Sequence, residues 1–320
     1  MTIKSFVRHN IPIIYDLYLD RLIRKSQAES RRIHDLSDAE LESCAADMYR
    51  RHMGRTLDWG NLQSFTEKMQ WAKIYDNDPR KVTFTDKFLV REHVKLKIGE
   101  RYLIPLLEVW DRARDIHFDE LPEGFVLKTN HASADAIPVR NKSGLYADQK
   151  REIIWRMDYA NRTDFGTRLL EMHYSKIRPK IIAEELIGIG EPDLLDYKFQ
   201  CFDGKPVFCF VDSNRAVNHH RNVYDMDWKL LAWNTGPYEN APEPINRPAH
   251  FDEMIRIAEI LSDDFPQVRI DLYNLSGTIY FGEMTFTAAA GLNRYSSYEA
   301  DLALGQMWNA DTKTRCRIDR

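Results

Sequence analysis

Short runs rich in apolar residues, between residues 124 and 286, are typical of β-strands. These runs are GFVLKTN, IPVR, KIIAEEL, YKFQCF and PVFCFVD, followed by the two arms of VRIDLYNLSGTIYFGEMTF. Asp203 and Gly204 separate two apolar runs as a two-residue hairpin turn, so these strands should pair antiparallel. Strands outnumber helices, and we therefore predict an α+β fold rather than a Rossmann fold.

Helical periodicity marks other parts of the chain. The segment LSDAELESCAADMYRRHMG begins with the capping-box pair Ser37 and Glu40 and ends at Gly54, which predicts a helix. Further helices are predicted over 148–160 and 251–263, and short ones within TEKMQWAKIYD and TDKFLVREHVKLKIG.

The first residues of the chain are both apolar and basic. Residues 3–33 carry a helical pattern that is interrupted at Pro12. A helix at a membrane surface and a helix packed on the protein's own body both fit this pattern. We favour packing on the body and keep peripheral association with a membrane as the alternative.

The composition is that of a globular protein. The chain has 320 residues, 43% of them hydrophobic, which is enough for two or three subdomains around a shared core. Its 45 basic and 49 acidic residues are interspersed, so the charge gives no reason to expect a nucleic-acid partner. The four cysteines lack a metal-binding spacing, and no run reaches the roughly 20 apolar residues of a membrane span. Because a signal-peptide pattern is also missing, we expect a cytoplasmic protein.

The apolar hairpin over residues 268–286 carries unexpected charges. With a three-residue loop at 275–277, Arg269 lies opposite Glu283, and Asp271 is the diagonal neighbour of Glu283. These three residues and Thr285 then project from one face of the hairpin, because side chains alternate with period 2.

Two explanations fit these charges. Two carboxylates on a partly buried face are costly without a counter-charge, and Arg269 offsets only one of them. A divalent cation such as Mg²⁺ would satisfy both Asp271 and Glu283. A salt bridge between Arg269 and Glu283, with Asp271 in solvent, explains the hairpin equally well.

Other charged residues stand at the ends of predicted strands or within them. Lys128 ends an apolar strand before a loop of small residues, where it can reach phosphate oxygens or lie in solvent. Lys198 lies within YKFQCF, and Glu184 and Glu185 end KIIAEEL. Arg221 follows two histidines in a predicted loop, as an anion ligand or a surface residue; the histidines lack further ligands at zinc spacing.

In this order the segments resemble the ATP-grasp superfamily, and in particular its TupA-like branch, which is associated with teichuronopeptide and other surface-polysaccharide synthesis. The similarity covers about residues 62–300. It is carried by FTEKMQWAKIYDNDP, TDKFLVREHVKLKIGERYLIPLLEVW, LPEGFVLKTNHAS, KIIAEELI, DYKFQCFDGKPVF, RNVYDMDW and VRIDLYNLSGTIYFGEMTF.

The resemblance implies an ATP-grasp fold in which two α+β subdomains clasp ATP, with an N-terminal helical extension. The expected parts are 1–60 as that extension, 61–120 as the N-terminal part of the ATP-grasp region, 121–187 as the small lid subdomain, 188–308 as the C-terminal subdomain with the metal site, and 309–320 as a tail.

The resemblance also implies how the nucleotide is bound. Lys87 is similar to the first lysine that contacts the nucleotide, and Lys128 is similar to the second, at the phosphates. Glu185 and Leu186 are similar to the segment whose backbone holds adenine, with Glu184 beside them.

For catalysis, the resemblance implies that Asp271 and Glu283 bind Mg²⁺, or Mn²⁺ in its place, with Thr285 in a weaker or water-mediated contact. Arg269 would stabilise charge at the transferred phosphate, and Lys198 would be a further cation in the nucleotide cleft. Arg221 is also expected to be a catalytic residue. The residues expected to bind the substrate are Arg221, His219, His220 and the loop at 287–291.

Two loops depart from the family pattern. The branch usually has NHGSG after the lysine strand and YPGSG after the metal strand, where this chain has NHASA and TAAAG. Alanine disfavours positive φ and restricts close backbone approach, so phosphate or substrate binding should differ at these loops. Because the lysines and carboxylates remain, we favour an altered substrate loop over an inactive protein.

The resemblance implies an ATP-dependent carboxylate-amine ligase that acts through an acylphosphate. The expected substrates are ATP, a uronic-acid carboxyl of a surface glycan or its precursor, and an amino acid or other amine. Alternatives are an ATP-grasp kinase, a nucleotide-binding protein without catalysis, and a metal-dependent glycosyltransferase that uses the DxD triplet from Asp225 to Asp227. The sequence gives no oligomeric state.

Overall fold

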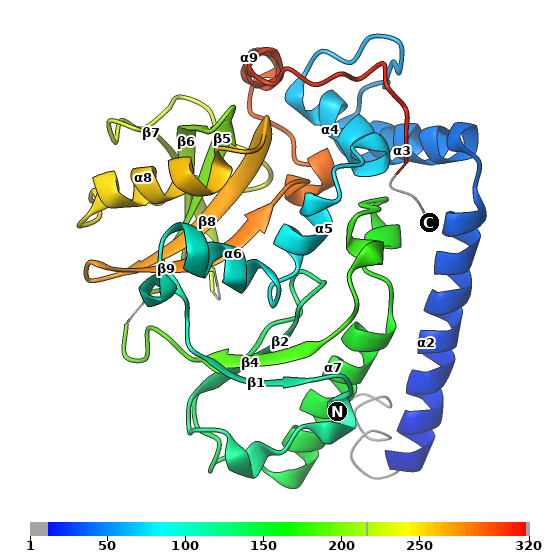
Figure 1. Cartoon of the computed structure of the whole chain (residues 1–320), viewed down its shortest axis with the longest axis vertical. Helices are drawn as coiled ribbons and strands as arrows, with labels where there is room; N and C mark the ends of the chain where they lie inside the picture. Colours follow the sequence, from blue (N-terminus) through cyan, green and yellow to red (C-terminus); the bar gives the residue numbers. More distant parts are fainter. Residues whose placement is uncertain (1–11, 192, 216, 318–320) are drawn as a thin grey trace. The chain divides into compact units, whose positions relative to one another are not determined.

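A computed structural model describes residues 12–191, 193–215 and 217–317. Figure 1 follows the chain from helix α2 in blue to helix α9 in red. The chain forms two compact units. The first contains the described residues up to Asp38 together with Pro105–Ile189, and the second contains Ala39–Ile104 and the described residues from Gly190 onward. The five-part division expected from the sequence stays a prediction.

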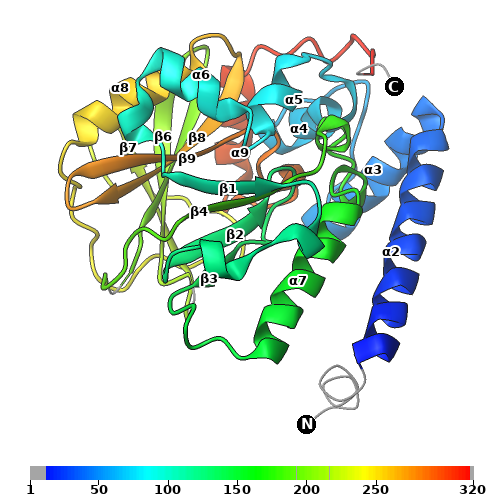
Figure 2. The ribbon, with the colours of Figure 1, turned by 60° about the horizontal axis from the view of Figure 1, so that its bottom comes forward.

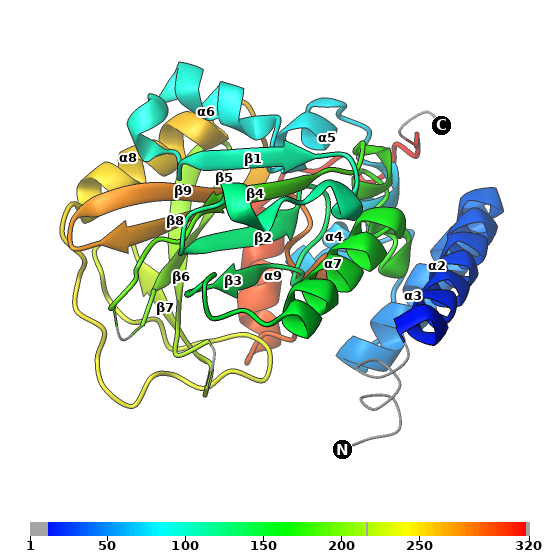
Figure 3. The same ribbon diagram turned by 90° about the horizontal axis from the view of Figure 1, so that it is seen from below.

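The first unit contains an antiparallel sheet of four strands in the order β1-β4-β2-β3. Helix α7 (Ala147–Arg162) packs along one face of this sheet (Figures 2 and 3). Phe125 and Leu127 pack with Ile153 and Met157 of that helix, so the alternating side chain of Lys128 projects from the opposite face. The strands are β1 (Leu106–Trp110), β2 (Phe125–Thr129), β3 (Ile137–Val139) and β4 (Ile181–Glu185).

Helix α2 (Pro12–Asp35) packs against α7 in the first unit. Leu19 and Ile23 form a buried cluster with Trp155, whose indole Nε1 donates to the Asp16 carboxylate at 2.6 Å. The predicted N-terminal helix is therefore confirmed from Pro12 onward, while its earlier part lies outside the described residues. None of the helices in the described ranges combines the length and the apolar character of a membrane-spanning segment.

The second unit contains an antiparallel sheet of five strands in the order β7-β6-β5-β8-β9. Helices α6 (Val90–Lys97) and α8 (Phe251–Ser262) contribute to the core on one face, where Phe199 of β5 and Ile270 of β8 are fully buried. The strands are β5 (Asp196–Phe202), β6 (Lys205–Ser213), β7 (His220–Asp225), β8 (Gln267–Leu275) and β9 (Thr278–Thr285).

The remaining helices of the second unit are tied together by polar contacts. Ser64 and Glu67 form a capping box at the start of α4. The buried carboxylate of Asp301 accepts from the Thr66 backbone N–H at 2.9 Å and from Arg55 at 2.6 Å. These helices are α3 (Asp38–Met53), α4 (Phe65–Tyr75), α5 (Arg80–Thr85) and α9 (Tyr298–Met307).

Short 3-10 turns occur in both units. They are η1 (Glu100–Tyr102), η2 (Ala113–Asp115), η3 (Phe118–Glu120), η4 (Gly166–Arg168), η5 (Tyr174–Lys176) and η6 (Ala288–Gly291).

Most of the predicted elements are confirmed. The helices expected at 37–53, 148–160 and 251–263 are present, and so are the predicted strands and the hairpin turn at Asp203 and Gly204. Two strands were missed. Strand β1 was not among the predicted strands, and β7 was read as a loop because its sequence, HRNVYD, is mostly polar.

The loop after β9 has an unusual backbone. Ala289 and Ala290 adopt φ values of 48° and 53°, in the left-handed region that alanine rarely occupies. The side-chain amide of Gln70 in α4 holds the loop by donating to the Ala290 carbonyl at 3.2 Å and to the Gly291 carbonyl at 3.1 Å. The tertiary structure therefore imposes positive φ on residues for which the sequence predicted the opposite.

Replacing Ala289 by glycine should stabilise the protein. Ala289 is exposed, so the change sacrifices little packing. Relief of about 1–2 kcal/mol of left-handed strain should exceed the roughly 0.5–1 kcal/mol entropic cost of glycine, for a net gain of about 0.5 kcal/mol. Urea-induced unfolding measures the difference. The control is Ala303→Gly in α9, where the same change should destabilise by about 1 kcal/mol. Equal losses in both variants would contradict the strain.

Candidate functional site

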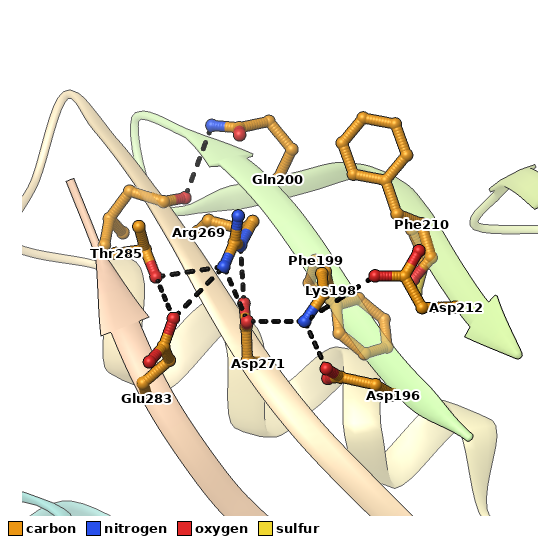
Figure 4. A network of polar contacts seen from close by, with 12 residues as sticks. Asp196, Lys198, Phe199, Gln200, Phe210, Asp212, Arg269, Asp271, Glu283 and Thr285 are labelled. Atoms are coloured by element: carbon orange, nitrogen blue, oxygen red, sulfur yellow. Dashed lines mark hydrogen bonds and ion pairs between the residues drawn. The ribbon is translucent and has the colours of Figure 1, made fainter. Parts of the chain in front are cut away.

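The face of the five-stranded sheet opposite its core carries a cluster of charged side chains. Lys198 of β5 pairs with Asp271 of β8, which in turn pairs with Glu283 of β9. Arg269 of β8 pairs with Thr285 of β9. Figure 4 shows these side chains projecting toward one another. The prediction that Arg269, Asp271, Glu283 and Thr285 share one face is therefore confirmed.

The predicted register of the hairpin is wrong. The turn contains two residues, Ser276 and Gly277, with φ values of 50° and 95°, instead of three. A bulge at Gly282 then shifts the pairing again, so that Glu283 lies directly opposite Asp271. Without the bulge Glu283 would point to the core side, because a shift of one residue exchanges the two faces of a strand.

The sequence contains a signal for this bulge. Ile279 and Phe281 face the core at odd positions, whereas Met284 and Phe286 face it at even positions. The alternation therefore slips by one residue at Gly282. A Cβ atom there would lie 3.0 Å from the Asp271 carbonyl oxygen, which explains why glycine occupies the bulge.

Arg269 is the centre of the cluster. Its guanidinium donates to both carboxylate oxygens of Asp271, at 2.6 and 2.7 Å. The Nη2 atom also donates to Glu283 Oε1 at 3.2 Å and to Thr285 Oγ1 at 3.1 Å. Burial lowers the pKa of the Arg269 guanidinium, but the nearby carboxylates of Asp271 and Glu283 have the larger effect, so the pKa is raised. This arginine is permanently charged and rigidly held.

Lys198 lies among three carboxylates and is 7% exposed. Its ammonium contacts Asp196 and lies 3.0 Å from Asp271 and 3.9 Å from Asp212. Burial would lower the pKa of Lys198, yet Asp196 and Asp271 overcome this effect and raise it. The lysine therefore remains a cation within the sheet.

Lys87 joins the cluster from the segment after α5. Its ammonium lies 3.7 Å from Glu283 Oε2, while Thr285 Oγ1 donates to Glu283 Oε1 at 2.8 Å. Burial raises the pKa of Glu283, but Lys87 and Arg269 exceed that effect and hold it at about 2. Glu283 is therefore ionised at neutral pH.

Arg221 lies in a separate part of the polar face, on β7. Its Nε and Nη2 atoms donate to the two Asp212 oxygens at 2.6 and 2.7 Å, and Nη1 donates to Thr235 at 3.1 Å. The guanidinium also lies over the rings of Phe210 and Tyr238. Burial raises the pKa of Asp212, but the hydrogen bonds and positive charge of Arg221 have a larger opposite effect. The pKa of Asp212 is therefore lowered to about 2. With its donors engaged, Arg221 holds β6, β7 and the 235–238 segment together.

The two histidines beside Arg221 also lie near β7. His219 Nε2 is 3.2 Å from Asp212 Oδ1, and its ring packs on Tyr238. His220 begins β7 and lies 3.1 Å from the Asn218 amide. Their predicted role in substrate binding, and that of Arg221, stays a prediction.

Sequence reasoning missed Asp196 and Asp212 as members of the cluster. The signal for Asp196 was present, because DYKFQCF alternates and places Asp196, Lys198 and Gln200 on one face. Asp212 lies directly opposite Asp196 in the β5–β6 hairpin, where an irregularity between Gln200 and Cys201 sets the register that alternation alone does not predict.

The carboxylates of the cluster are suited to a hard cation. Across the described parts of the chain, no three or more His, Cys, Asp or Glu side chains are grouped to hold a metal ion. Mg²⁺ often takes one or two protein carboxylates and completes six ligands with water and phosphate oxygens. Asp271 and Glu283, opposed on adjacent strands with the Thr285 hydroxyl beside them, fit such a role for a cation that arrives with a nucleotide.

The first unit contains the other predicted nucleotide-binding residues. Lys128 Nζ lies 2.6 Å from Glu184 Oε2, on the sheet face away from α7. Glu185 ends β4, where its N–H donates to the Pro105 carbonyl at 3.0 Å, and Leu186 is the first residue beyond the strand. The structure thus brings Lys128 and Glu184 together, while the roles assigned to all four residues stay predictions.

The comparisons with known proteins agree with the fold. The family model described as TupA-like ATPgrasp matches residues 67–309. No curated protein matches the chain.

Several solved structures are similar to parts of this chain at low sequence identity. The D-alanine-D-alanine ligase from Bacillus anthracis complexed with ATP is 16% identical over 72% of this chain and 64% of that chain, with a TM-score of 0.37. The ligase of the same name from Helicobacter pylori is 12% identical over 77% and 70%, with a TM-score of 0.38. The macrocyclase MdnC from Microcystis aeruginosa, bound with a precursor peptide, is 11% identical over 72% and 63%, with a TM-score of 0.34. The matched part is less than two thirds of the Bacillus anthracis and Microcystis aeruginosa chains.

Substitution of the bulge glycine should disturb the cluster. In Gly282→Ala the new methyl group would meet the Asp271 carbonyl at 3.0 Å, so the bulge must open and should cost about 1–3 kcal/mol of stability. Urea unfolding of the variant checks this loss. Gly60→Ala is the control, because Gly60 lies in an exposed turn and the nearest atom is the side-chain oxygen of Asp58. Equal stability of the two variants would exclude a steric requirement at residue 282.

Proposed function

The chain belongs to the TupA-like ATP-grasp family, and on that premise we propose that it is an ATP-dependent carboxylate-amine ligase. The observation that carries the proposal is the cluster of Arg269, Asp271, Glu283 and Lys198 on the polar face of the five-stranded sheet. Charges this deeply placed are costly unless they act on a ligand or neutralise one another. Here they neutralise one another and at the same time present oxygen and nitrogen ligands suited to a metal nucleotide.

The family resemblance assigns nucleotide-contacting residues to each unit. In the first unit, Lys128 and Glu184 are held 2.6 Å apart on the sheet face away from α7, and the adjacent backbone of Glu185 and Leu186 would receive adenine. In the second unit, Lys87 would contact the nucleotide from its position beside Glu283. The charge of each lysine is balanced by a carboxylate in the present state, so phosphate binding replaces one anionic partner with another.

Asp271 and Glu283 would hold Mg²⁺, or Mn²⁺ in its place, and the bound cation would neutralise the phosphate oxygens. Arg269, whose guanidinium donates to both carboxylates, would also stabilise negative charge on the transferred phosphoryl group. Lys198 lies next to Asp271 and would add positive charge at the same position. Because phosphoryl transfer concentrates negative charge on the phosphate oxygens, most of the catalysis would be electrostatic positioning.

The proposed reaction has two steps. A substrate carboxylate oxygen attacks the γ-phosphorus of ATP and the bond to the ADP oxygen breaks, which gives an acylphosphate and ADP. The amine nitrogen then attacks the acyl carbon, the carbon–oxygen bond to phosphate breaks, and the nitrogen loses a proton to give an amide and inorganic phosphate. No covalent intermediate on the protein is needed.

The proposed acceptor is the carboxyl group of a uronic acid in a surface polysaccharide or its precursor, and the amine is an amino acid or a related compound. This choice rests on the family's association with surface-polysaccharide synthesis. The loop at 287–291 and the segment around Arg221 are the proposed substrate contacts. The left-handed alanines of that loop differ from a glycine-rich loop in side-chain bulk, so they would shape the substrate side of the site.

The DxD triplet has a structural explanation. Asp225 Oδ1 accepts from the backbone N–H groups of Asp227, at 3.0 Å, and Lys229, at 2.8 Å, in the turn after β7. This geometry is that of an Asx turn. Glycosyl transfer thus has less support than the ligase, while a kinase and a nucleotide-binding protein without turnover remain outcomes that an assay separates.

Removal of either proposed metal ligand should abolish turnover. Purified protein would be incubated with Mg-ATP, an amino-acid panel and uronate oligosaccharides, and ADP formation and product mass would be followed. Asp271→Asn and Glu283→Gln should each lower ADP formation by about 100-fold or more, the order expected when a preorganised charge at a reacting phosphate is lost. Asp227→Asn is the matched control and should keep wild-type turnover.

The outcomes of this assay distinguish the alternatives. Amine-dependent ADP release with a condensation product supports the ligase, whereas phosphate retained on the acceptor identifies a kinase. ATP binding without ADP formation under any condition identifies a protein that binds without catalysis. Wild-type activity of Asp271→Asn or Glu283→Gln overturns the metal assignment, and loss of activity in Asp227→Asn with cleavage of a nucleotide sugar identifies a glycosyltransferase.

A cytoplasmic protein that modifies a lipid-linked precursor would meet its acceptor at a membrane, and the outer face of α2 supports such an encounter. Ile14, Leu17 and Tyr18 are 49%, 67% and 40% exposed near the start of this helix. Three exposed basic residues continue the same helix face, namely Arg21, Arg24 and Lys25. Apolar side chains beside basic ones are typical of helices that bind anionic membrane surfaces.

Vesicle binding tests this proposal. The full chain should sediment with vesicles of phosphatidylglycerol and phosphatidylcholine, and binding should fall with salt because the basic residues contribute electrostatically. Leu17→Glu should reduce the bound fraction severalfold. Leu96→Glu, at an 84% exposed leucine of α6, is the control and should bind as the wild type does. If Leu17→Glu also binds normally, α2 is not the membrane contact.

A further inference from the structure

The first unit contains a cavity of about 330 Å³ away from the residues proposed to bind ATP. It is bounded by α2, by α7 and by the loop at 132–135. Figures 2 and 3 show the two helices running alongside one another, with α2 in blue and α7 in green. Ligand pockets in proteins begin at roughly 300 Å³, so this cavity accommodates one ring-sized group.

Aromatic side chains form one wall of the cavity. Tyr15 and Tyr159 are half-buried, and both pack on the cluster around Trp155. The ring centroids of Tyr15 and Trp155 are 4.3 Å apart, and the Trp155 indole N–H is bound by Asp16 at 2.6 Å. These contacts fix the rings in place, so the wall is preorganised for a flat or ring-shaped ligand.

Charged side chains, two basic and two acidic, also line the cavity. Arg156 and Arg168 are both exposed, and Arg168 donates to the Thr163 hydroxyl at 3.1 Å, which fixes its guanidinium. Of the two acids in the lining, Asp135 accepts from the Thr129 backbone N–H at 2.7 Å, and Glu152 is likewise engaged within the protein. The guanidinium groups thus offer N–H donors in the geometry that binds a carboxylate.

We propose that this cavity binds an acidic sugar ring, a uronic-acid unit of the acceptor glycan, as a docking site separate from the reacting groups. The sugar ring would lie against Tyr15 and Tyr159, and its carboxylate would be bound by Arg156 and Arg168. The identity of the ligand rests on the proposed function. The existence of an aromatic-walled pocket with two arginines does not, because it follows from the residues that line it.

The cavity lies on the other side of the sheet from the lysine assigned to phosphate binding. Asp135 of the cavity is bonded to Thr129, the neighbour of Lys128 at the end of β2. Adjacent strand residues point to opposite faces, and Lys128 contacts Glu184 on the face away from α7. A glycan unit in the cavity would therefore contact the loop that follows β2 without occupying the position of the nucleotide.

Calorimetry on the full chain without ATP tests the proposal. A tetrasaccharide containing glucuronic acid should bind, and neutral maltotetraose should bind at least tenfold more weakly. Arg156→Gln should weaken binding of the acidic tetrasaccharide by about tenfold, the loss expected for a charge-assisted hydrogen bond. Ala160→Phe, which fills the cavity from α7, should abolish binding. Arg140→Gln changes an exposed arginine of the same unit that does not line the cavity, and it should leave the affinity unchanged.

The outcomes are separable from those of the ligase assay. Asp271→Asn should still bind the acidic tetrasaccharide, because its substitution lies in the second unit. Thermal unfolding of Ala160→Phe and Arg156→Gln establishes that both variants are folded. Equal affinity for the acidic and neutral tetrasaccharides, or undiminished binding by folded Ala160→Phe, overturns the proposal. Failure of the wild type to bind the acidic tetrasaccharide at millimolar concentration also overturns the proposal. The proposed ATP-dependent reaction is tested separately by the ligase assay.

Discussion

Mutual neutralisation of buried charges holds the polar face of the five-stranded sheet together. Asp271 accepts from Arg269 and contacts Lys198, while Glu283 contacts Arg269 and lies near Lys87. An isolated buried charge costs several kcal/mol, and breaking a buried pair by removing one partner is strongly destabilising. The cluster is therefore a set of charges that need one another, and a metal nucleotide would enter by exchanging partners rather than by filling an uncharged space. That requirement explains why Asp271 and Glu283, which pair directly across β8 and β9, both accept from Arg269.

The hairpin residues of this cluster could be predicted from the sequence to share one face, but their pairing could not. Period-2 alternation placed Arg269, Asp271, Glu283 and Thr285 on one face, although the assumed register was wrong. The shorter turn at Ser276 and Gly277 moves the pairing by one residue, and the bulge at Gly282 moves it again, so the side chains return to the predicted face. Each of these two features exchanges the faces of the strand, so their effects on side-chain direction cancel. Alternation of apolar and polar residues alone does not reveal either feature.

The rest of the site escaped prediction for reasons of tertiary structure. Strand β7 consists largely of polar residues, and its assignment depends on pairing with β6, which propensity does not reveal. Without β7, Arg221 looked like a loop residue available to an anion, whereas the structure engages it with Asp212 and Thr235. The alanines at 289 and 290 were expected to avoid positive φ, and the amide of Gln70 holds the adjoining carbonyls in the observed conformation. In each case a contact distant in sequence overrides a local preference.

The strand order of the second unit bears on how the chain folds. Strands β5 and β6 form a hairpin over a two-residue turn, whereas Lys198 and Asp271, paired across β5 and β8, are 73 positions apart. Contacts between distant segments form late, because closing the long intervening loop costs entropy. Lys198 already has Asp196 in its own strand and Asp212 in β6 as counter-charges. Within the β5–β6 hairpin, Lys198 therefore already has two carboxylates beside it. Its charge is paired before β8 adds Asp271.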